Sequence, residues 1–81
     1  MKAIVHVGLK AGVLDPQGKA VADMLSRMGF SEVAGVRIGK VIELELGPGL
    51  AGEDAEQRVR EMCEQLLANT VIERYTIEVV E

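Results

Sequence analysis

The feature that most constrains the fold is a strict alternation of side-chain types at both ends of the chain. In residues 2–9 the odd positions are apolar, whereas Lys2 and His6 occupy the opposite side. Residues 71–80 alternate in the same way. A period of two is typical of strands with one buried face. We therefore expect a strand at each end of the chain, with these inward side chains: Ala3, Val5, Val7, Leu9, Val71, Tyr75, Ile77 and Val79.

Two helices are predicted between these strands. Asp15 is a good N-cap, Pro16 suits the first helical position, and Gly29 suits the left-handed residue that ends a helix. A second helix should begin near residue 53, where acidic side chains favour a helix N-terminus, and end near Asn69. Its apolar stripe consists of Ala55, Val59, Met62, Cys63 and Leu66.

The middle segment, residues 33–46, returns to strand chemistry. Gly39-Lys40 is the turn candidate, but a two-residue turn would reverse the alternation between its arms, and no reversal occurs. The segment is therefore either a hairpin with a three-residue loop at 39–41 or one long strand with a bulge at the glycine. We favour the hairpin, because the whole segment is long for a single strand.

The resulting order predicts an α+β domain spanning residues 1–81. It is the order of a two-layer, ferredoxin-like βαββαβ sandwich, with an antiparallel sheet and two helices on one face. A single strand at 33–46 would give βαβαβ instead. The other sheet face should carry branched aliphatic side chains between charged ones, which indicates a subunit contact. These aliphatic residues are Ile4, Val41, Ile72 and Val80.

Length and cysteine content point to self-association. A chain of 81 residues buries only about 60% of its unfolded surface, so small domains usually rely on disulfides, a metal or a partner chain. Cys63 is the single cysteine, and no His/Cys cluster offers a metal site. We therefore expect a homodimer or a homotetramer.

Charge and hydropathy exclude several classes of partner. The net charge of −4 and the shortage of aromatic residues argue against nucleic acid as a partner. No apolar run approaches membrane-spanning length, and no signal peptide opens the sequence. An unpaired cysteine suits a reducing compartment, so the expected location is cytoplasmic.

Two glycine-containing segments are not explained by helix or strand signals. A glycine in the first turn of a helix costs about 1 kcal/mol relative to alanine, so Gly18 indicates close approach by another backbone. Arg37 and Lys40 place two cations beside Gly39. They either pair across the strands with nearby glutamates or contact an anionic group on a partner.

Three blocks of sequence resemble a known family. They are Leu14-Asp15-Pro16-Gln17-Gly18, Val36-Arg37-Ile38-Gly39-Lys40 and Leu66-Leu67-Ala68-Asn69-Thr70-Val71-Ile72-Glu73. Their order and spacing resemble PurS, the small subunit of bacterial phosphoribosylformylglycinamidine synthase. The resemblance implies structural or subunit-contact roles, and no catalytic role, for Asp15, Gln17, Gly18, Arg37, Gly39, Lys40, Asn69 and Glu73.

The resemblance implies a non-catalytic adaptor in purine biosynthesis. In such systems the PurL synthetase binds ATP, with magnesium, and formylglycinamide ribonucleotide (FGAR), and the PurQ glutaminase releases ammonia. The assembled enzyme makes formylglycinamidine ribonucleotide (FGAM). No catalytic residue, cofactor or metal is then expected in this chain, because ATP and Mg would be bound by the partner synthetase.

Two other functions suit the predicted fold. One is a regulatory module that senses a small molecule. The other is a hydrolase of the acylphosphatase type, which needs an arginine and an asparagine beside an anion cradle. Arg37 and Asn69 are predicted in different parts of the domain, and the loop at residues 10–15 lacks arginine. The hydrolase is therefore the least favoured hypothesis.

Overall fold

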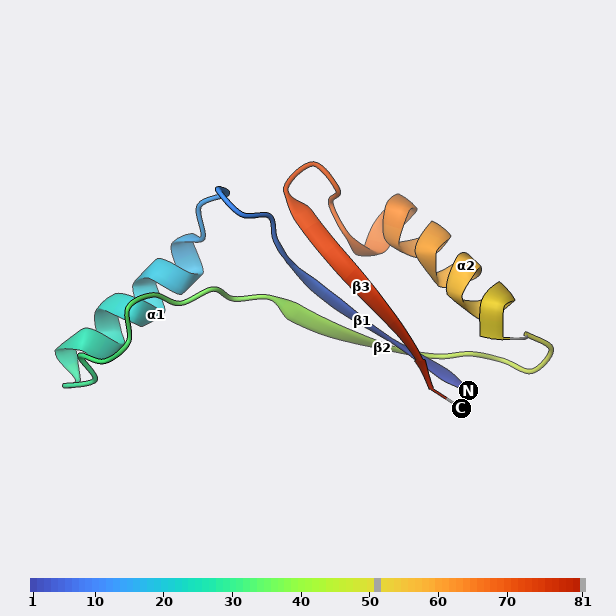
Figure 1. The fold of residues 1–81 in the computed structure, drawn as a ribbon, viewed down its shortest axis with the longest axis horizontal. Helices are drawn as coiled ribbons and strands as arrows, with labels where there is room; N and C mark the ends of the chain where they lie inside the picture. Colours follow the sequence, from blue (N-terminus) through green and yellow to red (C-terminus); the bar gives the residue numbers. More distant parts are fainter. Residues whose placement is uncertain (51, 81) are drawn as a thin grey trace.

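Three antiparallel strands form a single sheet in which the two alternating ends of the chain lie side by side (Figure 1). β1 (Lys2–Leu9) is the central strand, and β2 (Lys40–Glu45) and β3 (Glu73–Val80) are its neighbours. The structure is a computed structural model that describes residues 1–50 and 52–80. The predicted α+β class and antiparallel sheet are confirmed.

The sheet register places the predicted inward side chains of β1 on one face. Val5 lies opposite Ile42 of β2 and Ile77 of β3. α2 (Gly52–Met62) packs on this face. The largest fully buried side chains are two valines and one cysteine, so the core is small and contributes limited hydrophobic stabilisation. The buried core residues are Ala3, Val5, Val7, Ala55, Val59, Cys63 and Ala68.

α1 (Pro16–Arg27) begins and ends near the predicted residues. The Asp15 side chain accepts a hydrogen bond from the Gly18 N–H and caps the helix. Gly29 has a φ of 98°, the left-handed conformation that favours glycine at the end of a helix. Local signals therefore define this helix.

α2 continues directly into η1 (Cys63–Leu67), a short π-helix. Each hydrogen bond of a π-helix spans five residues, so later side chains rotate relative to an α-helical continuation. Cys63 stays in the core, but Leu66 is 83% exposed, and Leu67 packs against the core in its place. The predicted apolar stripe of the second helix is therefore wrong at Leu66.

Residues 33–46 contain a single strand, β2, and the predicted hairpin is wrong. The pairing of β1 with β2 is continuous and ends where Val7 lies opposite Lys40. Residues 34–39 have no regular secondary structure, and the Ile38 N–H bonds to the Asp15 side chain, which precedes α1. The observed order is βαβαβ, without the long bulged strand of the alternative. It remains consistent with a small ferredoxin-like α+β fold.

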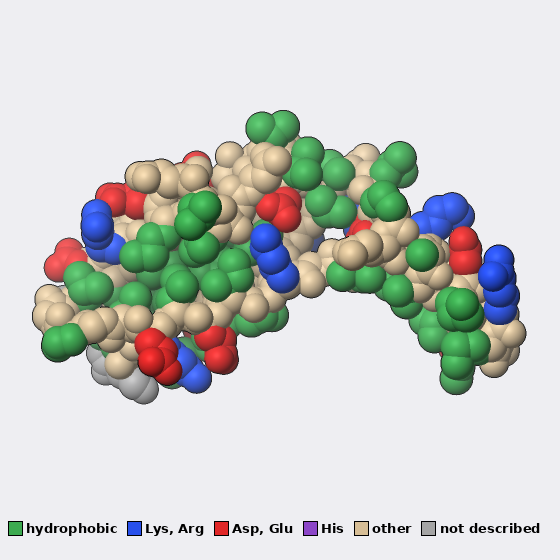
Figure 2. Space-filling view, turned by 180° about the vertical axis from the view of Figure 1, so that it is seen from behind, with side chains coloured by type: hydrophobic (Ala, Val, Ile, Leu, Met, Phe, Trp, Pro, Cys, Tyr) green, Lys and Arg blue, Asp and Glu red, His purple; other side chains and the backbone are tan. Residues whose placement is uncertain are grey.

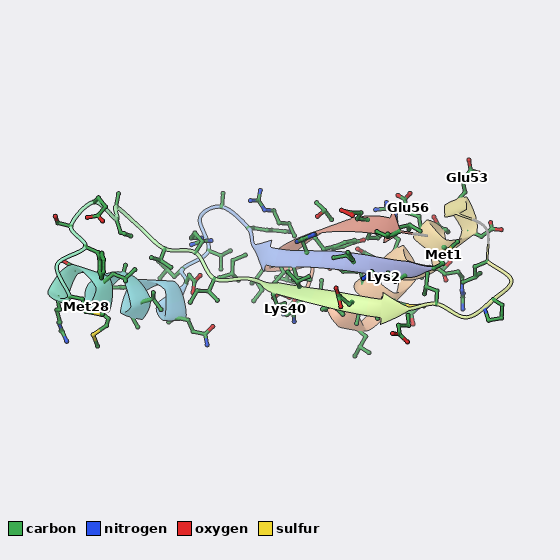
Figure 3. All side chains as sticks on the ribbon, turned by 90° about the horizontal axis from the view of Figure 1, so that it is seen from below. Met1, Lys2, Met28, Lys40, Glu53 and Glu56 are labelled. Atoms are coloured by element: carbon green, nitrogen blue, oxygen red, sulfur yellow. The ribbon has the colours of Figure 1, made fainter. Side chains whose placement is uncertain are left out.

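Among the described residues, α2 and the π-helix that follows it cover the sheet, whereas α1 lies beyond the ends of the strands (Figure 1). The prediction that both helices pack on one face is therefore wrong. α1 and residues 28–35 form a projection that we call the arm, and they make the molecule elongated, with extents of 51 × 25 × 14 Å. A narrower region joins the arm to the rest of the molecule (Figure 2). Met28, at the far end of α1 in Figure 3, is 63% exposed.

Candidate functional site at the elbow

The chain passes twice between the sheet and the arm. The first passage, residues 10–15, leads from β1 to α1. The second passage, residues 36–39, leads from the arm into β2. We call these two passages together with Gly18 the elbow. Asp15, Gly18, Arg37 and Gly39, four of the residues predicted as subunit contacts, lie within it.

Asp15 binds both passages at once. Its Oδ1 accepts a hydrogen bond from the Gly18 N–H at 2.8 Å, as an N-cap does. Its Oδ2 accepts a second hydrogen bond from the Ile38 N–H at 2.7 Å, across the elbow. The bonds from Ile38 and Gly18 stabilise the ionised carboxylate, and with the nearby charge of Arg37 they lower the pKa of Asp15 from its ordinary value.

Arg37 binds the same two passages from the other side. Its Nη1 donates a hydrogen bond to the Val13 carbonyl oxygen at 2.8 Å, and its Nη2 donates to the Lys10 carbonyl oxygen at 3.1 Å. The planar guanidinium group suits two acceptors at once. In this structure the Arg37 side chain is thus engaged by backbone carbonyl groups of the first passage.

Glycine at two positions allows backbones to approach closely. A Cβ atom at Gly18 would clash with the Val36 carbonyl oxygen, and one at Gly39 would lie 2.5 Å from the Val7 carbonyl oxygen. Cβ atoms essentially never come within 3.0 Å of other heavy atoms. The predicted close approach at Gly18 is confirmed, and the approaching backbone belongs to the same chain.

Asn69 and Glu73 hold the loop before β3. The Asn69 backbone N–H donates a hydrogen bond to Glu73 Oε1 at 2.6 Å, and Asn69 Oδ1 accepts one from the Val71 N–H at 3.2 Å. The Lys10 N–H donates to the Ile72 carbonyl oxygen at 2.8 Å, which attaches this loop to the start of the elbow. The third sequence block therefore lies beside the passage that leads to the first.

A groove of about 380 Å³ lies between the elbow and this loop, with mostly apolar walls. Arg37 lines a second groove, of about 530 Å³, between α1 and residues 34–37. Gly18 and Asn69 line neither groove. The first groove is lined by five of the eight predicted contact residues: Asp15, Gln17, Gly39, Lys40 and Glu73. The fold thus brings residues from three sequence blocks together, and their contact with a partner stays a prediction.

His6 and Cys63, which lie outside the elbow, occupy the sheet surface and the core respectively. His6 is exposed on the open face of the sheet, opposite Val41 and Thr76. Cys63 is fully buried, and burial raises the pKa of its thiol.

Across the described part of the chain, no group of three or more His, Cys, Asp and Glu residues is arranged to hold a metal ion. No helix there has the length and apolar character needed to cross a membrane.

One contact between β3 and η1 was not predicted. The Tyr75 hydroxyl donates a hydrogen bond to Glu64 Oε2 at 2.7 Å. This bond to a carboxylate favours the neutral phenol and raises the pKa of Tyr75. A tyrosine at an inward strand position carries a hydroxyl group that needs a partner, and this signal could have indicated the contact.

Comparison with known proteins decides the family. The sequence model of PurS, described as phosphoribosylformylglycinamidine (FGAM) synthase, matches residues 2–81. The chain belongs to the PurS family. It is 52% identical over 80 residues to the PurS subunit of Bacillus subtilis, which covers 99% of this chain and 93% of that protein. The identity to the PurS subunit of Synechocystis is 50% over 76 residues, and the match covers 93% of this chain and 74% of that protein.

Solved PurS structures share this fold. B. subtilis PurS has a TM-score of 0.88 at 52% identity, with 99% of this chain and 98% of that chain covered. A chain in the structure of PurLQS from Thermotoga maritima has a TM-score of 0.85 at 32% identity, and the match covers 95% of this chain and 93% of that chain. Because these matches extend over nearly the whole chain, they include the arm as well as the sheet.

Proposed function

We propose that this chain is the non-catalytic adaptor of the FGAM synthase complex, through which the PurL synthetase and the PurQ glutaminase assemble. The complex is a ligase of purine biosynthesis that converts FGAR, ATP and glutamine into FGAM. The similarity to T. maritima PurLQS is the observation that carries this proposal, because that structure is described as PurL, PurQ and PurS together.

The chemistry of the described residues supports an adaptor. The side chains of Asp15 and Arg37 bind backbone groups of the chain itself. The Cys63 thiol is buried and ionises less readily than an exposed thiol. We assign ATP and Mg to the synthetase and no cofactor to this chain. The free buried cysteine suits a reducing compartment, and we propose a cytoplasmic location.

We further propose that the chain associates with copies of itself as a homodimer or a homotetramer. The small core leaves a thin stability margin, and apolar side chains of the arm are uncovered. The open face of the sheet also exposes Val41, at 60%. The uncovered residues of the arm are Val21, Met24, Met28, Phe30 and Val33.

Light scattering tests the self-association. The Met24→Lys variant introduces a charge into the uncovered face of the arm, and it should shift the mass distribution toward the monomer. Ser26→Lys is the control, because it places the same charge at a polar position of the same helix. A wild-type protein that is monomeric at micromolar concentration would contradict the proposal.

Reconstitution with purified PurL and PurQ tests the adaptor function. Glutamine-dependent FGAM formation should require this chain, because ammonia must pass between two proteins that it brings together. FGAM formation by PurL from added ammonia is the control, since it bypasses the glutaminase. An unchanged glutamine-dependent rate after omission of this chain would refute the proposed function.

A further inference from the structure

The arm depends on the elbow for its orientation. α2 packs on the sheet, but α1 lies beyond the strand ends without comparable packing (Figure 1). The arm is therefore not held in place by a shared hydrophobic core. Within a single chain, the direction of the arm relative to the sheet is set where the two passages of the elbow lie against each other.

The two passages are joined by reciprocal hydrogen bonds. Asp15, from the first passage, accepts from the Ile38 N–H of the second at 2.7 Å. Arg37, from the second passage, donates to the Val13 and Lys10 carbonyl oxygens of the first at 2.8 and 3.1 Å. The two side chains thus cross the elbow in opposite directions. Together their three bonds resist both sliding of one passage along the other and separation of the two passages.

The second oxygen of Asp15 has no role in forming the helix. One acceptor for the Gly18 N–H is enough to cap α1, and serine caps a helix about as well as aspartate does. The bond from Oδ2 to the Ile38 N–H serves only the connection between the passages. Gly18 permits this connection, because any Cβ there would clash with the Val36 carbonyl oxygen.

We propose that Asp15 and Arg37 are positioning residues that lock the arm at one angle to the sheet, and that adaptor activity requires this fixed angle. The inference rests on the proposed function, since an adaptor must present its contact surfaces in a fixed relation. The two residues act through the orientation of the arm and touch no reacting group.

The Asp15→Ser variant separates the two roles of this residue. Serine retains the cap for the Gly18 N–H but is too short to reach the Ile38 N–H as well. The matched control is Asp23→Ser, which removes a carboxylate of the same helix that pairs with exposed Lys19 at 3.7 Å. Circular dichroism should show unchanged helix content in both variants.

Spin labels measure the angle directly. One label is placed on the arm by Ser26→Cys and one on α2 by Gln57→Cys; both positions are exposed, and the native Cys63 is buried. An excess of unlabelled wild-type chain keeps the measured distances within single molecules. We expect a narrow distance distribution for the wild type and Asp23→Ser, and a broadened one for Asp15→Ser.

Arg37→Lys tests the other half of the lock. Lysine keeps the positive charge but lacks the planar fork that engages two carbonyl oxygens. It should broaden the same distribution. Either change should raise the concentration of chain that gives half-maximal glutamine-dependent FGAM formation about two- to tenfold, which corresponds to one hydrogen bond.

The outcomes distinguish the two proposals. If the wild-type chain fails to support glutamine-dependent synthesis, the adaptor function is refuted, and with it the claim that the lock serves that function. If the wild type is active and the distance distribution stays narrow in both Asp15→Ser and Arg37→Lys, the lock itself is refuted. Broadened distributions with unchanged half-maximal concentrations would refute the requirement for a fixed angle.

Discussion

The hydroxyl group of Tyr75 donates a hydrogen bond of 2.7 Å to the Glu64 carboxylate, and it joins β3 to the π-helix that follows α2. Tyr75 is the only tyrosine in the chain, so phenol titration reports on the surroundings of this one side chain. The contact lies at the rim of a core that contains no large buried side chain among the described residues.

Removing the charge of Glu64 should lower the pKa of Tyr75. The carboxylate accepts the phenolic hydrogen and disfavours the tyrosinate, which raises the pKa above its ordinary value. In the Glu64→Gln variant, tyrosinate absorbance should therefore appear at lower pH than in the wild type. Glu78→Gln, an exposed change on the other sheet face, is the control. Identical titration curves for Glu64→Gln and wild type would show that the contact is absent in solution.

Alanine at Gly39 should destabilise the fold. The added Cβ would lie 2.5 Å from the Val7 carbonyl oxygen, so the backbone at the start of β2 must shift. We expect a loss of about 1–3 kcal/mol in the free energy of unfolding, measured by urea denaturation. Gly35→Ala is the matched control, because nothing lies within 4 Å of a Cβ there. Equal stabilities of the two variants would contradict the close approach seen at Gly39.

Alanine at Gly18 sets two effects against each other. Helix propensity alone would stabilise α1 by about 1 kcal/mol. The clash with the Val36 carbonyl oxygen opposes this gain, because it involves backbone that cannot rotate away. We expect the clash to dominate, with net destabilisation of about 1–2 kcal/mol in urea denaturation. A stabilised Gly18→Ala variant would mean that the elbow is open in solution.

The stabilisation provided by the Asp15 carboxylate should disappear in acid. Its folded-state pKa is lowered by hydrogen bonds from the Ile38 and Gly18 N–H groups. The ionised group therefore contributes stability above its unfolded-state pKa of about 3.9 and loses that contribution as pH falls through the lower folded-state value. The difference in unfolding free energy between wild type and Asp15→Asn should shrink as the pH falls below about 5.

Urea denaturation at a series of pH values measures this difference. Asparagine still caps the helix but has a single acceptor oxygen, so the comparison measures the charge of the carboxylate together with its bond from the Ile38 N–H. Asp23→Asn controls for the loss of a carboxylate from the same helix. A wild-type advantage over Asp15→Asn that stays constant from neutral to acidic pH would contradict the role given to the charge.

Cys63 should react slowly with thiol reagents in the folded protein. The side chain is fully buried, and burial raises the pKa of the thiol, so little reactive thiolate is available. Labelling should accelerate in urea, in step with unfolding. The thiol introduced by Ser26→Cys on the exposed arm is the positive control. Comparable native-state rates at the two positions would mean that the helical region over the sheet opens readily.

Much of the local structure follows directly from the sequence. Asp15 and Gly29 mark the limits of α1, because the cap and the left-handed residue act within one turn of the helix. Alternation correctly predicts the buried face of β1, since side chains of a strand point to opposite faces in turn. The close approach at Gly18 was also predicted, because a glycine in the first turn of a helix needs a reason.

The predicted hairpin shows where pattern reading failed. Residues 36–38 keep the alternation of β2, yet they pair with no strand. Alternation reports that side chains point to opposite sides of the chain, and it does not report whether another strand lies alongside. Similarly, helical spacing placed Leu66 in the core, but the π-helix moved it to the surface.

The sequence by itself determined the family, the α+β class and the ends of the first helix, because all of these reside in short blocks of neighbouring residues. Only the tertiary structure decided that α1 leaves the sheet and becomes an arm. At the base of the arm, the Asp15 carboxylate accepts a hydrogen bond from the Ile38 N–H, which joins positions 23 residues apart. A period of two or of 3.6 residues carries no information about such a contact, because the partner is a backbone group that every residue type except proline possesses.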